Sequence, residues 1–381
     1  MGNFKVLHVL EGLDIGGKEI CAMNFYRNVD RKKVQFDFAI HSSSVGYFEN
    51  EINKLGGTVI HYAQGKKINN KFMQFLYHMK CFNKFIKKNH YDIVHIHGCS
   101  FFAILTASIP CKVNGVKNII AHAHNPGMPT GSKFNKMIRE IFKWLIKWSC
   151  TQYFTCSDVA ADSKYTKDIL EKKLTYIHNA INLEKFQFCQ KDRIVIRQEY
   201  KVSNNEILLG IVGRLEKQKN HDYLLSIFNE LYKKNSNYKL IVIGTGSLES
   251  ELKDKVKTLN LQSAVIFTGN ISEPEKYYSA IDIFVLPSFY EGFPFVMIEA
   301  QANGLPCITS DRITSEVCIL DSTYQLPIGD ENINRWVEHI EYMHLNLDRN
   351  RFIKILKSKG FDIKDESKRL EDLYIKMKGD V

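Results

Sequence analysis

The stretch Ile207–Asn220 has the sequence I-L-L-G-I-V-G-R-L-E-K-Q-K-N, a short apolar run followed by a glycine and a loop rich in cations. An apolar run of this length that ends at a glycine predicts a buried strand. Similar runs alternate with longer stretches of helical period along the chain, and the pattern restarts near Ile207. Such alternation is typical of parallel sheets with helices on both faces. The sequence therefore predicts an α/β protein with two doubly wound, Rossmann-like domains that face a cleft.

The seam between the domains is expected near Asn182–Phe188, which gives domains of 1–183 and 184–363. The charged, helix-prone tail at about 364–381 is expected to pack back on the first domain. The strands expected in the two domains are Phe4–Leu10, Phe36–His41, Thr58–Tyr62, Ile93–His97, Asn118–His122, Gln152–Cys156, Leu174–Ile177, and then Ile207–Val212, Lys239–Ile243, Val265–Thr268, Ile283–Leu286 and Pro306–Thr309.

The composition is that of a globular protein. Of 381 residues, 44% are hydrophobic and 25% are charged. Nine cysteines occur without a C-x-x-C pair, which favours reduced thiols in a cytosolic protein over a disulfide framework or a zinc site. No apolar run approaches the ~18 residues that cross a bilayer. Val6–Leu10 is followed by Glu11 and Asp14, so we interpret it as a first strand and not as a signal peptide.

The positive charge is concentrated in the first half of the chain. Residues 1–180 contain 25 Lys and Arg against 13 Asp and Glu, whereas the remainder contains 27 against 29. This asymmetry predicts that one face meets an anionic partner, for which nucleic acid and a membrane surface are both candidates. A merely solvated lysine surface remains the alternative.

Two cations lie in the loop that follows Ile207–Val212. Arg214 and Lys219 are five residues apart, within a loop that enters a helix, and together they could neutralise a diphosphate. Because ligands of doubly wound sheets bind beyond the carboxyl ends of the strands, this is a favourable position for a binding site.

The segment Pro287–Phe295 and its continuation form the most specific motif. It places Glu291 in a turn rich in Gly and Pro, and Glu299 about two turns into a helix that begins near Phe295. Backbone amides of residues 293–296 would lie at the N-terminus of that helix, where negative charge is stabilised. Two carboxylates, which only accept hydrogen bonds, could hold sugar hydroxyls.

Glycine pairs and histidine pairs follow other strands. Gly16-Gly17, in the segment Gly12–Lys18, and Gly244-Thr245-Gly246 allow close approach of backbone to phosphate, although each could equally be a tight turn. The spacing is not G-x-G-x-x-G, which argues against a nicotinamide enzyme. His122 and His124 form an H-x-H without an apparent third metal ligand, and His124 could donate a hydrogen bond to a substrate. A structural role is favoured for a second H-x-H, His95 and His97.

Taken in their order along the chain, these motifs resemble those of the family 4 retaining glycosyltransferases of GT-B architecture. That family includes enzymes of bacterial capsule and exopolysaccharide synthesis. The resemblance covers roughly residues 4–330. It is carried by Gly16-Gly17, His124, Asn179 in I-H-N-A-I-N, G-R-L-E-K-Q-K-N at 213–220, Gly244-Thr245-Gly246, Leu286-Pro287-Ser288, and Glu291 and Glu299 as an E-x7-E pair. The usual glycine of one family turn is Ala180 here, and Thr314 also departs from the family pattern.

The resemblance implies the role of each site residue. Glu291 would contact the transferred sugar, Arg214 and Lys219 would stabilise the departing nucleotide, and His124 would lie beside the donor sugar, so these four are the expected catalytic group. Glu299 would hold the ribose. The residues expected to bind the donor are Gly16, Gly17, Gly213, Gly244, Gly246, Asn270, Ser288, Phe293, Pro294, Phe295, Val296 and Glu299.

The implied reaction moves a hexose or N-acetylhexosamine from a nucleotide-diphosphate sugar, expected to be UDP-linked, to a saccharide or a polyprenyl-diphosphate-linked saccharide. The second domain would bind the donor and the first the acceptor. No D-x-D motif occurs, so we expect neither a metal nor another cofactor; the cations and the helix amides could stabilise the leaving group instead.

The segment Lys133–Trp148 is basic and amphipathic. Phe134, Ile138, Ile141, Leu145 and Trp148 share a helical face, and Lys133, Lys136, Lys143 and Lys147 supply charge. This helix and the excess of positive charge in residues 1–180 together favour contact with an anionic membrane over a nucleic-acid partner. We therefore expect a cytoplasmic protein that is peripheral to the inner face of the cell membrane. A helix that faces the core is the alternative.

Two other functions would also fit part of the sequence. A nucleotide-sugar epimerase of similar architecture would lack the E-x7-E motif combined with the cationic loop. A basic nucleic-acid-binding protein would need a recognition module, and the sequence contains none.

Overall fold

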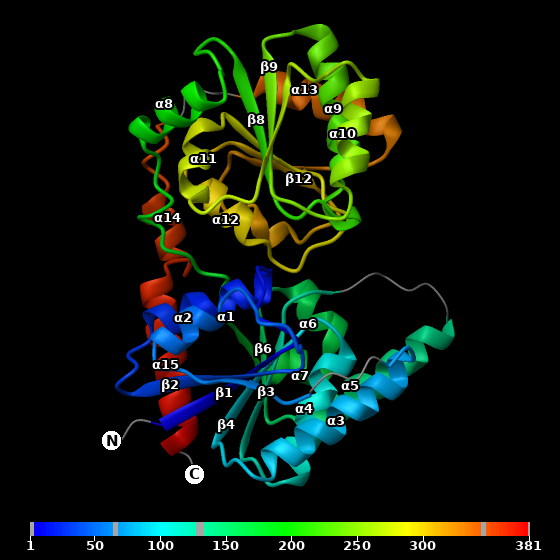
Figure 1. Ribbon diagram of the computed structural model, residues 1–381, viewed down its shortest axis with the longest axis vertical. Helices are drawn as coiled ribbons and strands as arrows, with labels where there is room; N and C mark the ends of the chain where they lie inside the picture. Colours follow the sequence, from blue (N-terminus) through cyan, green and yellow to red (C-terminus); the bar gives the residue numbers. More distant parts are fainter. Residues whose placement is uncertain (1–3, 64–67, 127–132, 344–347, 380–381) are drawn as a thin grey trace. The chain divides into compact units, whose positions relative to one another are not determined.

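A computed structural model describes all residues except 1–3, 64–67, 127–132, 344–347 and 380–381; the side chains of 133–135 are also outside the description. The chain divides into two compact units (Figure 1). Unit 1 is Met1–Ala180 with Ile363–Val381, and unit 2 is Ile181–Asp362. The division falls close to the seam expected from the sequence, and the C-terminal tail belongs to unit 1.

Unit 1 contains a seven-stranded parallel sheet in the order β3-β2-β1-β4-β5-β6-β7. The apolar runs of the sequence account for these strands, since β2, β4 and β5 are buried along their whole length. The strands are β1 (Phe4–Leu10), β2 (Val34–Ile40), β3 (Val59–His61), β4 (Ile93–Gly98), β5 (Asn118–Ala123), β6 (Gln152–Thr155) and β7 (Leu174–Tyr176).

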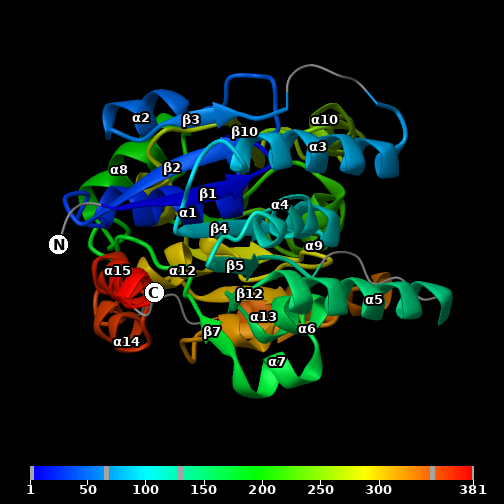
Figure 2. The same cartoon turned by 90° about the horizontal axis from the view of Figure 1, so that it is seen from below.

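Helices cover this sheet. α3, α4 and α5 are neighbours in one layer (Figure 2), with α4 in contact with the other two. The C-terminal α15 contacts α1, β2 and β4, and its Glu371 accepts hydrogen bonds from the Asp30 amide and from Lys33. The helices of unit 1 are α1 (Gly17–Asn28), α2 (Glu49–Lys54), α3 (Lys71–Ile86), α4 (Phe101–Val113), α5 (Lys133–Ser149), α6 (Asp158–Lys164), α7 (Lys167–Lys172) and α15 (Ile363–Gly379).

Unit 2 contains a six-stranded parallel sheet in the order β10-β9-β8-β11-β12-β13. Its strands are β8 (Ile207–Val212), β9 (Tyr238–Ile243), β10 (Val265–Gly269), β11 (Ile283–Leu286), β12 (Cys307–Ser310) and β13 (Thr323–Leu326). Its helices are α8 (Gln190–Glu199), α9 (His221–Lys234), α10 (Glu249–Thr258), α11 (Pro274–Ala280), α12 (Phe295–Ala302), α13 (Ile333–Tyr342) and α14 (Ile353–Ser358), with short 3-10 segments η1 (Lys217–Lys219), η2 (Ser315–Val317) and η3 (Asp330–Asn332).

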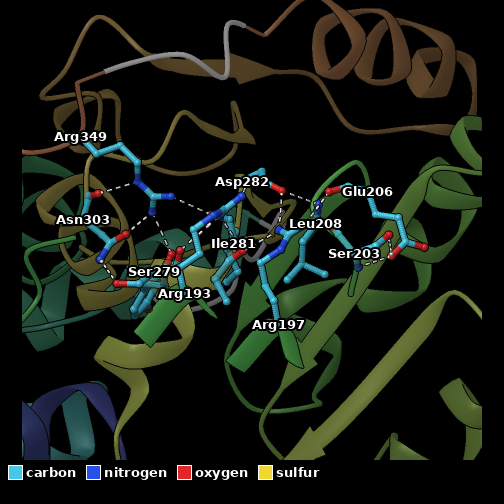
Figure 3. A network of polar contacts seen from close by, with 12 residues as sticks. Arg193, Arg197, Ser203, Glu206, Leu208, Ser279, Ile281, Asp282, Asn303 and Arg349 are labelled. Atoms are coloured by element: carbon cyan, nitrogen blue, oxygen red, sulfur yellow. Dashed lines mark hydrogen bonds and ion pairs between the residues drawn. The ribbon is translucent and has the colours of Figure 1, made fainter. Parts of the chain in front are cut away.

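A polar network fixes the amino-terminal ends of β8 and β11 (Figure 3). Asp282, just before β11, accepts from Arg193 (2.6 Å), Arg197 (3.0 Å) and the Leu208 amide (2.8 Å). Arg349 donates to the carbonyl oxygens of Tyr278, Ile281 and Asn303, and burial lowers the pKa of its guanidinium to about 9. These bonds hold α8 and α11 against the sheet, which leaves the carboxyl ends of the strands for ligands.

Each sheet has a topological switch point. In unit 1 the order reverses between β1 and β4, and in unit 2 between β8 and β11. The connections that leave two such neighbouring strands diverge, and ligands of doubly wound sheets bind beyond the carboxyl ends of these strands. In unit 2, the loop after β8 carries Arg214 and Lys219, and the loop after β11 carries Glu291, so the topology brings both motifs to the switch point.

Two further properties bear on the sequence expectations. All nine cysteines are free thiols. Within the described residues, every helix is too short or too polar to span a bilayer.

Candidate active site

The glycines of unit 2 allow two loops to approach closely. Gly213 and Gly244 have φ angles of 158° and 130°. A Cβ atom on Gly244 would lie 2.2 Å from the carbonyl oxygen of Gly213, and one on Gly246 would lie 2.4 Å from that of Leu215. The Leu215 amide donates to the carbonyl of Thr245 at 2.9 Å. The close contact between the loops after β8 and β9 therefore requires glycine at 244 and 246. This requirement holds whether or not these glycines also approach a phosphate.

The cationic loop is tied to the loop after β11. Asn220, in the left-handed conformation (φ 56°), donates from its side-chain amide to the carbonyl of Pro287 at 3.1 Å. The Phe289 amide donates to the carbonyl of Gln218 at 2.9 Å. These bonds hold Lys219 next to the turn that contains Glu291.

Lys219 and Glu291 form a largely buried ion pair. Nζ of Lys219 lies 2.9 Å from Oε1 of Glu291, with the two side chains 14% and 9% exposed. Gln218 donates to the other carboxylate oxygen of Glu291 at 3.1 Å and to the carbonyl of Tyr290 at 2.9 Å. By contrast, Arg214 is exposed, and its guanidinium has no ion pair or hydrogen bond with any described residue. The site thus combines a pre-positioned ammonium with an available guanidinium.

Glu299 is held by a tyrosine that the motif did not reveal. It is the fifth residue of α12, so it lies little more than one turn into the helix and not two turns, as the sequence had suggested. Tyr278 on α11 donates to its Oε2 at 2.6 Å. Burial raises the pKa of Glu299 to about 7, and the bond from Tyr278 acts in the opposite direction. No spacing rule links α11 to α12, so only the fold could show this partner.

The N-terminus of α12 begins at Phe295, as expected, with Pro294 as the cap residue. The first amides of a helix have no partner within it, so those of Phe295 and Val296 are available to an anion. Phe293 packs its ring against Phe361 at 5.5 Å. The side chain therefore has a packing role, and only its backbone remains as a ligand candidate.

Two other predicted donor residues differ in accessibility. Ser288 is fully buried, and its hydroxyl has no hydrogen-bond partner among the described residues. Asn270 is exposed and accepts a hydrogen bond from Thr245 at 3.2 Å.

The predicted residues of the first domain lie in unit 1. Gly16 is the N-cap residue of α1, and Gly17 has open space where a Cβ would be. Lys18 follows and pairs with Glu11 and Glu19. His124 comes directly after β5 and is 8% exposed; its Nε2 is 2.9 Å from Nδ1 of His97.

A cavity of about 310 Å³ opens in unit 1 at the carboxyl ends of β1 and β4. Glu11, His41, Lys71, His78 and Phe102 contribute to its lining. The imidazoles of His41 and His78 are stacked with centroids 4.3 Å apart. Burial and the neighbouring His41 lower the pKa of His78 to about 4, so its ring is neutral near pH 7. The sequence motifs gave no indication of this cavity.

The amphipathic helix α5 presents a different face from the one expected. Met137, Ile141, Trp144 and Trp148 are 56%, 52%, 59% and 44% exposed, whereas Ile146 is buried. Ile138 and Leu145 are half-buried, and the side chain of Phe134 is outside the described residues. The predicted face therefore combined residues from two sides of the helix. The apolar residues at 137, 141, 144 and 148 are called the α5 stripe below.

The lysines of α5 are less available than expected. Lys143 is only 13% exposed and lies 3.4 Å from Glu140, and Lys147 pairs with Asp168 at 2.8 Å. Lys136 is exposed, and the side chain of Lys133 is outside the described residues.

Comparison with known proteins places both units in one enzyme class. Residues 15–185 match the model of Glycosyltransferase Family 4, and residues 192–358 match that of Glycosyl transferases group 1. The putative glycosyltransferase EpsF of Bacillus subtilis is 29% identical over 375 residues, covering 97% of this chain and 96% of that protein. A galactosyltransferase of Escherichia coli, named for UDP-Gal and α-D-GlcNAc-diphosphoundecaprenol, is 29% identical over 77% of this chain and 78% of its own length.

Solved structures show the same fold. HepE of Anabaena in complex with UDP and glucose aligns with a TM-score of 0.76 at 16% identity, over 97% of this chain and 99% of that one. Sucrose-phosphate synthase of Thermosynechococcus elongatus aligns with a TM-score of 0.79 at 16% identity, over 99% and 100%. The two sheets, the paired motifs and these matches agree, and the chain belongs to the family 4 glycosyltransferases of GT-B architecture.

Proposed function

We propose that this glycosyltransferase moves a hexose or N-acetylhexosamine from a UDP-linked donor, with retention of configuration and without a metal, to a saccharide or lipid-linked saccharide of a surface polysaccharide. The observation that carries the proposal is the Lys219–Glu291 pair at the switch point of unit 2, in the same loop as an exposed Arg214 that has no ion pair with any described residue. The names of relatives support the substrates: one contains UDP-Gal and diphosphoundecaprenol, another is a capsular polysaccharide glycosyltransferase, and HepE was solved with UDP-glucose.

The cations account for the departure of the leaving group. When the bond between the anomeric carbon and the phosphate oxygen breaks, its electron pair remains on the diphosphate. Arg214, Lys219 and the first amides of α12 would stabilise that charge, because they are fixed before the reaction begins. The absence of a D-x-D motif from the sequence supports a reaction that does not depend on a metal.

The two glutamates would orient the donor. Glu291, held by Lys219 and Gln218, would accept hydrogen bonds from hydroxyls of the transferred sugar. Glu299 would accept from the ribose, most strongly when it is ionised, because both of its oxygens then act as acceptors. In a retaining displacement, the acceptor oxygen bonds to the anomeric carbon on the face that the diphosphate leaves, and the acceptor's proton passes to an oxygen of the diphosphate. No nucleophile from the protein is required.

The cavity of unit 1 is the proposed acceptor site. Its lining offers a lysine, a carboxylate and two neutral imidazoles beside aromatic rings. Aromatic faces pack on the apolar faces of sugar rings, and polar side chains fix the hydroxyls. The rings of Phe72, Phe75, Phe102 and Phe142 continue from this cavity over α3, α4 and α5, with centroids 4.9–6.2 Å apart from one ring to the next.

The α5 stripe is the proposed membrane contact. Four large apolar side chains at helical spacing are exposed, although such residues are usually buried. Trp is favoured at the interface between lipid and water. Lys136 and the excess of positive charge in residues 1–180 favour an anionic bilayer, which is consistent with a lipid-linked acceptor and a peripheral protein at the inner face of the cell membrane.

A donor panel tests the proposal. The purified protein would be incubated with UDP-, GDP- and ADP-linked sugars in the presence of EDTA, and release of the nucleotide and the anomeric configuration of the product would be measured. We expect turnover of a UDP-hexose or UDP-N-acetylhexosamine. The anomeric configuration of the product should match that of the donor. Arg214→Ala should lower the rate of turnover at least a hundredfold. Wild-type activity of Arg214→Ala or Glu291→Ala, or inversion at the anomeric carbon, would contradict the mechanism.

A further inference from the structure

Five histidines are buried together on one face of the sheet of unit 1. They alternate along their strands, with His8 on β1, His95 and His97 on β4, and His122 and His124 at the end of β5. Their ring centroids are 4.0–5.5 Å apart. Burial lowers the pKa of each imidazole well below its usual range, so all five are neutral at physiological pH.

The rings form two separate hydrogen-bonded chains. In one, Tyr374 of α15 bonds His95 (2.5 Å), whose other nitrogen bonds His122 (3.0 Å). In the other, Nδ1 of His8 is 2.9 Å from Nε2 of His97, and Nδ1 of His97 is 2.9 Å from Nε2 of His124. Only the second chain ends at a residue expected to contact substrate.

The number of protons decides the direction of the second chain. Three neutral imidazoles carry three N–H groups, and two of these are used between the rings. The third must be at one of the two ends, either Nε2 of His8 or Nδ1 of His124. The direction of every bond in the chain follows from that choice.

The surroundings of His8 exclude a proton on its Nε2. Nε2 of His8 is fully buried without a hydrogen-bond partner among the described residues. The ring packs against Phe36 at 4.0 Å and Phe38 at 5.5 Å, which offer no acceptor. A buried N–H without an acceptor is rarer and more costly than a bare lone pair. Therefore His8 donates from Nδ1 to His97, and His97 donates from Nδ1 to His124.

We propose that the His8–His97 chain fixes His124 as the Nδ1–H tautomer, so that it presents an uncharged hydrogen-bond donor to an oxygen of the bound sugar nucleotide. Nδ1 of His124 is not among the buried unpartnered atoms of the described residues. The nearby cation Lys18 is engaged by Glu11 and Glu19. His97 is then a positioning residue, since it acts through His124. The substrate assignment depends on the function proposed above, whereas the tautomer does not.

The close nitrogens also raise the question of a metal. Two trios, His8 with His95 and His97, and His97 with His122 and His124, have ligand atoms near enough to share an ion. However, most of these nitrogens already have hydrogen-bond partners. Both nitrogens of His97 are bonded to His8 and His124, and both nitrogens of His95 are bonded to Tyr374 and His122. A divalent charge at full burial would also need an anionic ligand to balance it, and neither trio includes one. The hydrogen-bonded chain is therefore favoured, and zinc binding is an outcome that the test must address.

NMR of the substrate-free protein tests the tautomer. The protein would be labelled with ¹⁵N-histidine, and long-range ¹H–¹⁵N spectra distinguish protonated from bare ring nitrogens; loss of signals in His124→Gln assigns the residue. We expect His124 to have a protonated Nδ1 and a bare Nε2. A protonated Nε2 on His124, or zinc retained at one equivalent per chain after dialysis against EDTA, would overturn the proposal.

Matched variants test the link to the reaction. His97→Leu removes the donor to Nε2 of His124, and His95→Leu removes an equally buried ring two residues away on the same strand but in the other chain. Hydrolysis of the UDP-sugar without acceptor avoids effects on the nearby cavity. We expect His97→Leu to lower kcat for hydrolysis about tenfold and to shift His124 towards the Nε2–H tautomer. His97→Gln, whose amide can accept from His8 and donate to His124, should restore both, and His95→Leu should change neither.

The two sets of outcomes separate the claims. An Nδ1–H tautomer with unchanged hydrolysis in His97→Leu would retain the chain but overturn its role toward substrate. Equal losses in His95→Leu and His97→Leu would show a general packing effect and overturn the positioning role. Absence of turnover with every sugar nucleotide would contradict the proposed function while leaving the tautomer measurement decisive.

Discussion

The ammonium of Lys219 lies 2.9 Å from a carboxylate oxygen of Glu291, with both side chains largely withdrawn from solvent. Such a pair contributes little net stability, because desolvation offsets the attraction, but breaking it leaves a buried charge without compensation. The pair therefore orients the two groups that are proposed to bind the donor, at a modest cost in stability. In the proposed mechanism, the cation turns to the diphosphate when the donor binds.

The first prediction separates the catalytic role of Lys219 from its structural role. Lys219→Met should lower kcat/KM by about 10²–10³, because a fixed donor to the leaving group is lost. It should also lower the midpoint of thermal unfolding, since Glu291 is left unpaired. The double variant with Glu291→Gln should recover that midpoint but not the activity. Lys217→Met, an exposed lysine of the same loop, is the control. Equal activity of the two lysine variants would refute the role.

The second prediction concerns Glu299 and pH. Its carboxyl has a pKa of about 7 in the folded protein, above the ordinary 4.5 of an unfolded chain. The native state therefore keeps a proton that the unfolded state releases, so stability is lost as pH rises from about 4.5 to about 7. Glu299→Gln avoids this loss. It should be more stable by about 3 kcal/mol at pH 8 and close to wild type near pH 4.5.

Thermal unfolding of the two proteins at several pH values measures this difference. We expect Glu299→Gln to unfold roughly 5–10 °C higher at pH 8, yet to bind UDP more weakly by calorimetry because the carboxylate is gone. Glu251→Gln, which changes an exposed glutamate of α10, is the control. A difference in midpoint that does not depend on pH would show that ionisation of Glu299 is not the cause.

Much of the fold could be predicted from the sequence because buried parallel strands are continuous apolar runs. Phe4–Leu10, Ile207–Val212 and Ile283–Leu286 form strands with the expected bounds. The strand Thr323–Leu326 was missed. It is short, lies at the edge of its sheet, and has an exposed Tyr324 within it, so it lacks the apolar run that marks the others.

The positions of the candidate site residues could be predicted where a motif is local, and not where they depend on packing. The loop of Lys219 and the turn of Glu291 could be placed from their positions after strands. The partner of Glu299, Tyr278, lies on another helix, and His8 reaches His124 only through the register of three strands. For α5, the helix was correct but its exposed face was not, because helical spacing alone cannot show which side meets the neighbouring α4.

The third prediction concerns the α5 stripe. The double variant Ile141→Glu/Trp144→Glu places two charges on the exposed face without touching the buried Ile146. Loss of the apolar contact, about 2–4 kcal/mol by burial of the two side chains, should reduce binding to phosphatidylglycerol vesicles more than tenfold. Flotation of protein with vesicles of increasing anionic content measures it. Tyr342→Glu, 81% exposed in unit 2, should bind as wild type does.

Two results of that experiment would count against the membrane contact. Wild-type protein that stays in solution at every anionic content would exclude it. Equal binding by the stripe variant and by Tyr342→Glu would show that net charge, and not the stripe, is responsible, in which case binding should fall steeply with salt for both.

The fourth prediction concerns the cavity of unit 1. His78 is stacked on His41 at the cavity wall, and both rings are neutral at pH 7 because burial lowers the pKa of each. Removing one ring should weaken contact with the acceptor sugar, while the proposed binding site for UDP in unit 2 should be unaffected. We expect His78→Ala to raise the acceptor KM about tenfold, the effect of losing about 1.4 kcal/mol of contact, with little change in the affinity for UDP.

Steady-state kinetics at saturating donor measure this difference, and His90→Ala, which removes an exposed histidine, is the control. If His78→Ala weakens UDP binding as much as it raises the acceptor KM, the cavity is not a separate acceptor site, because a selective loss is what a site confined to unit 1 requires.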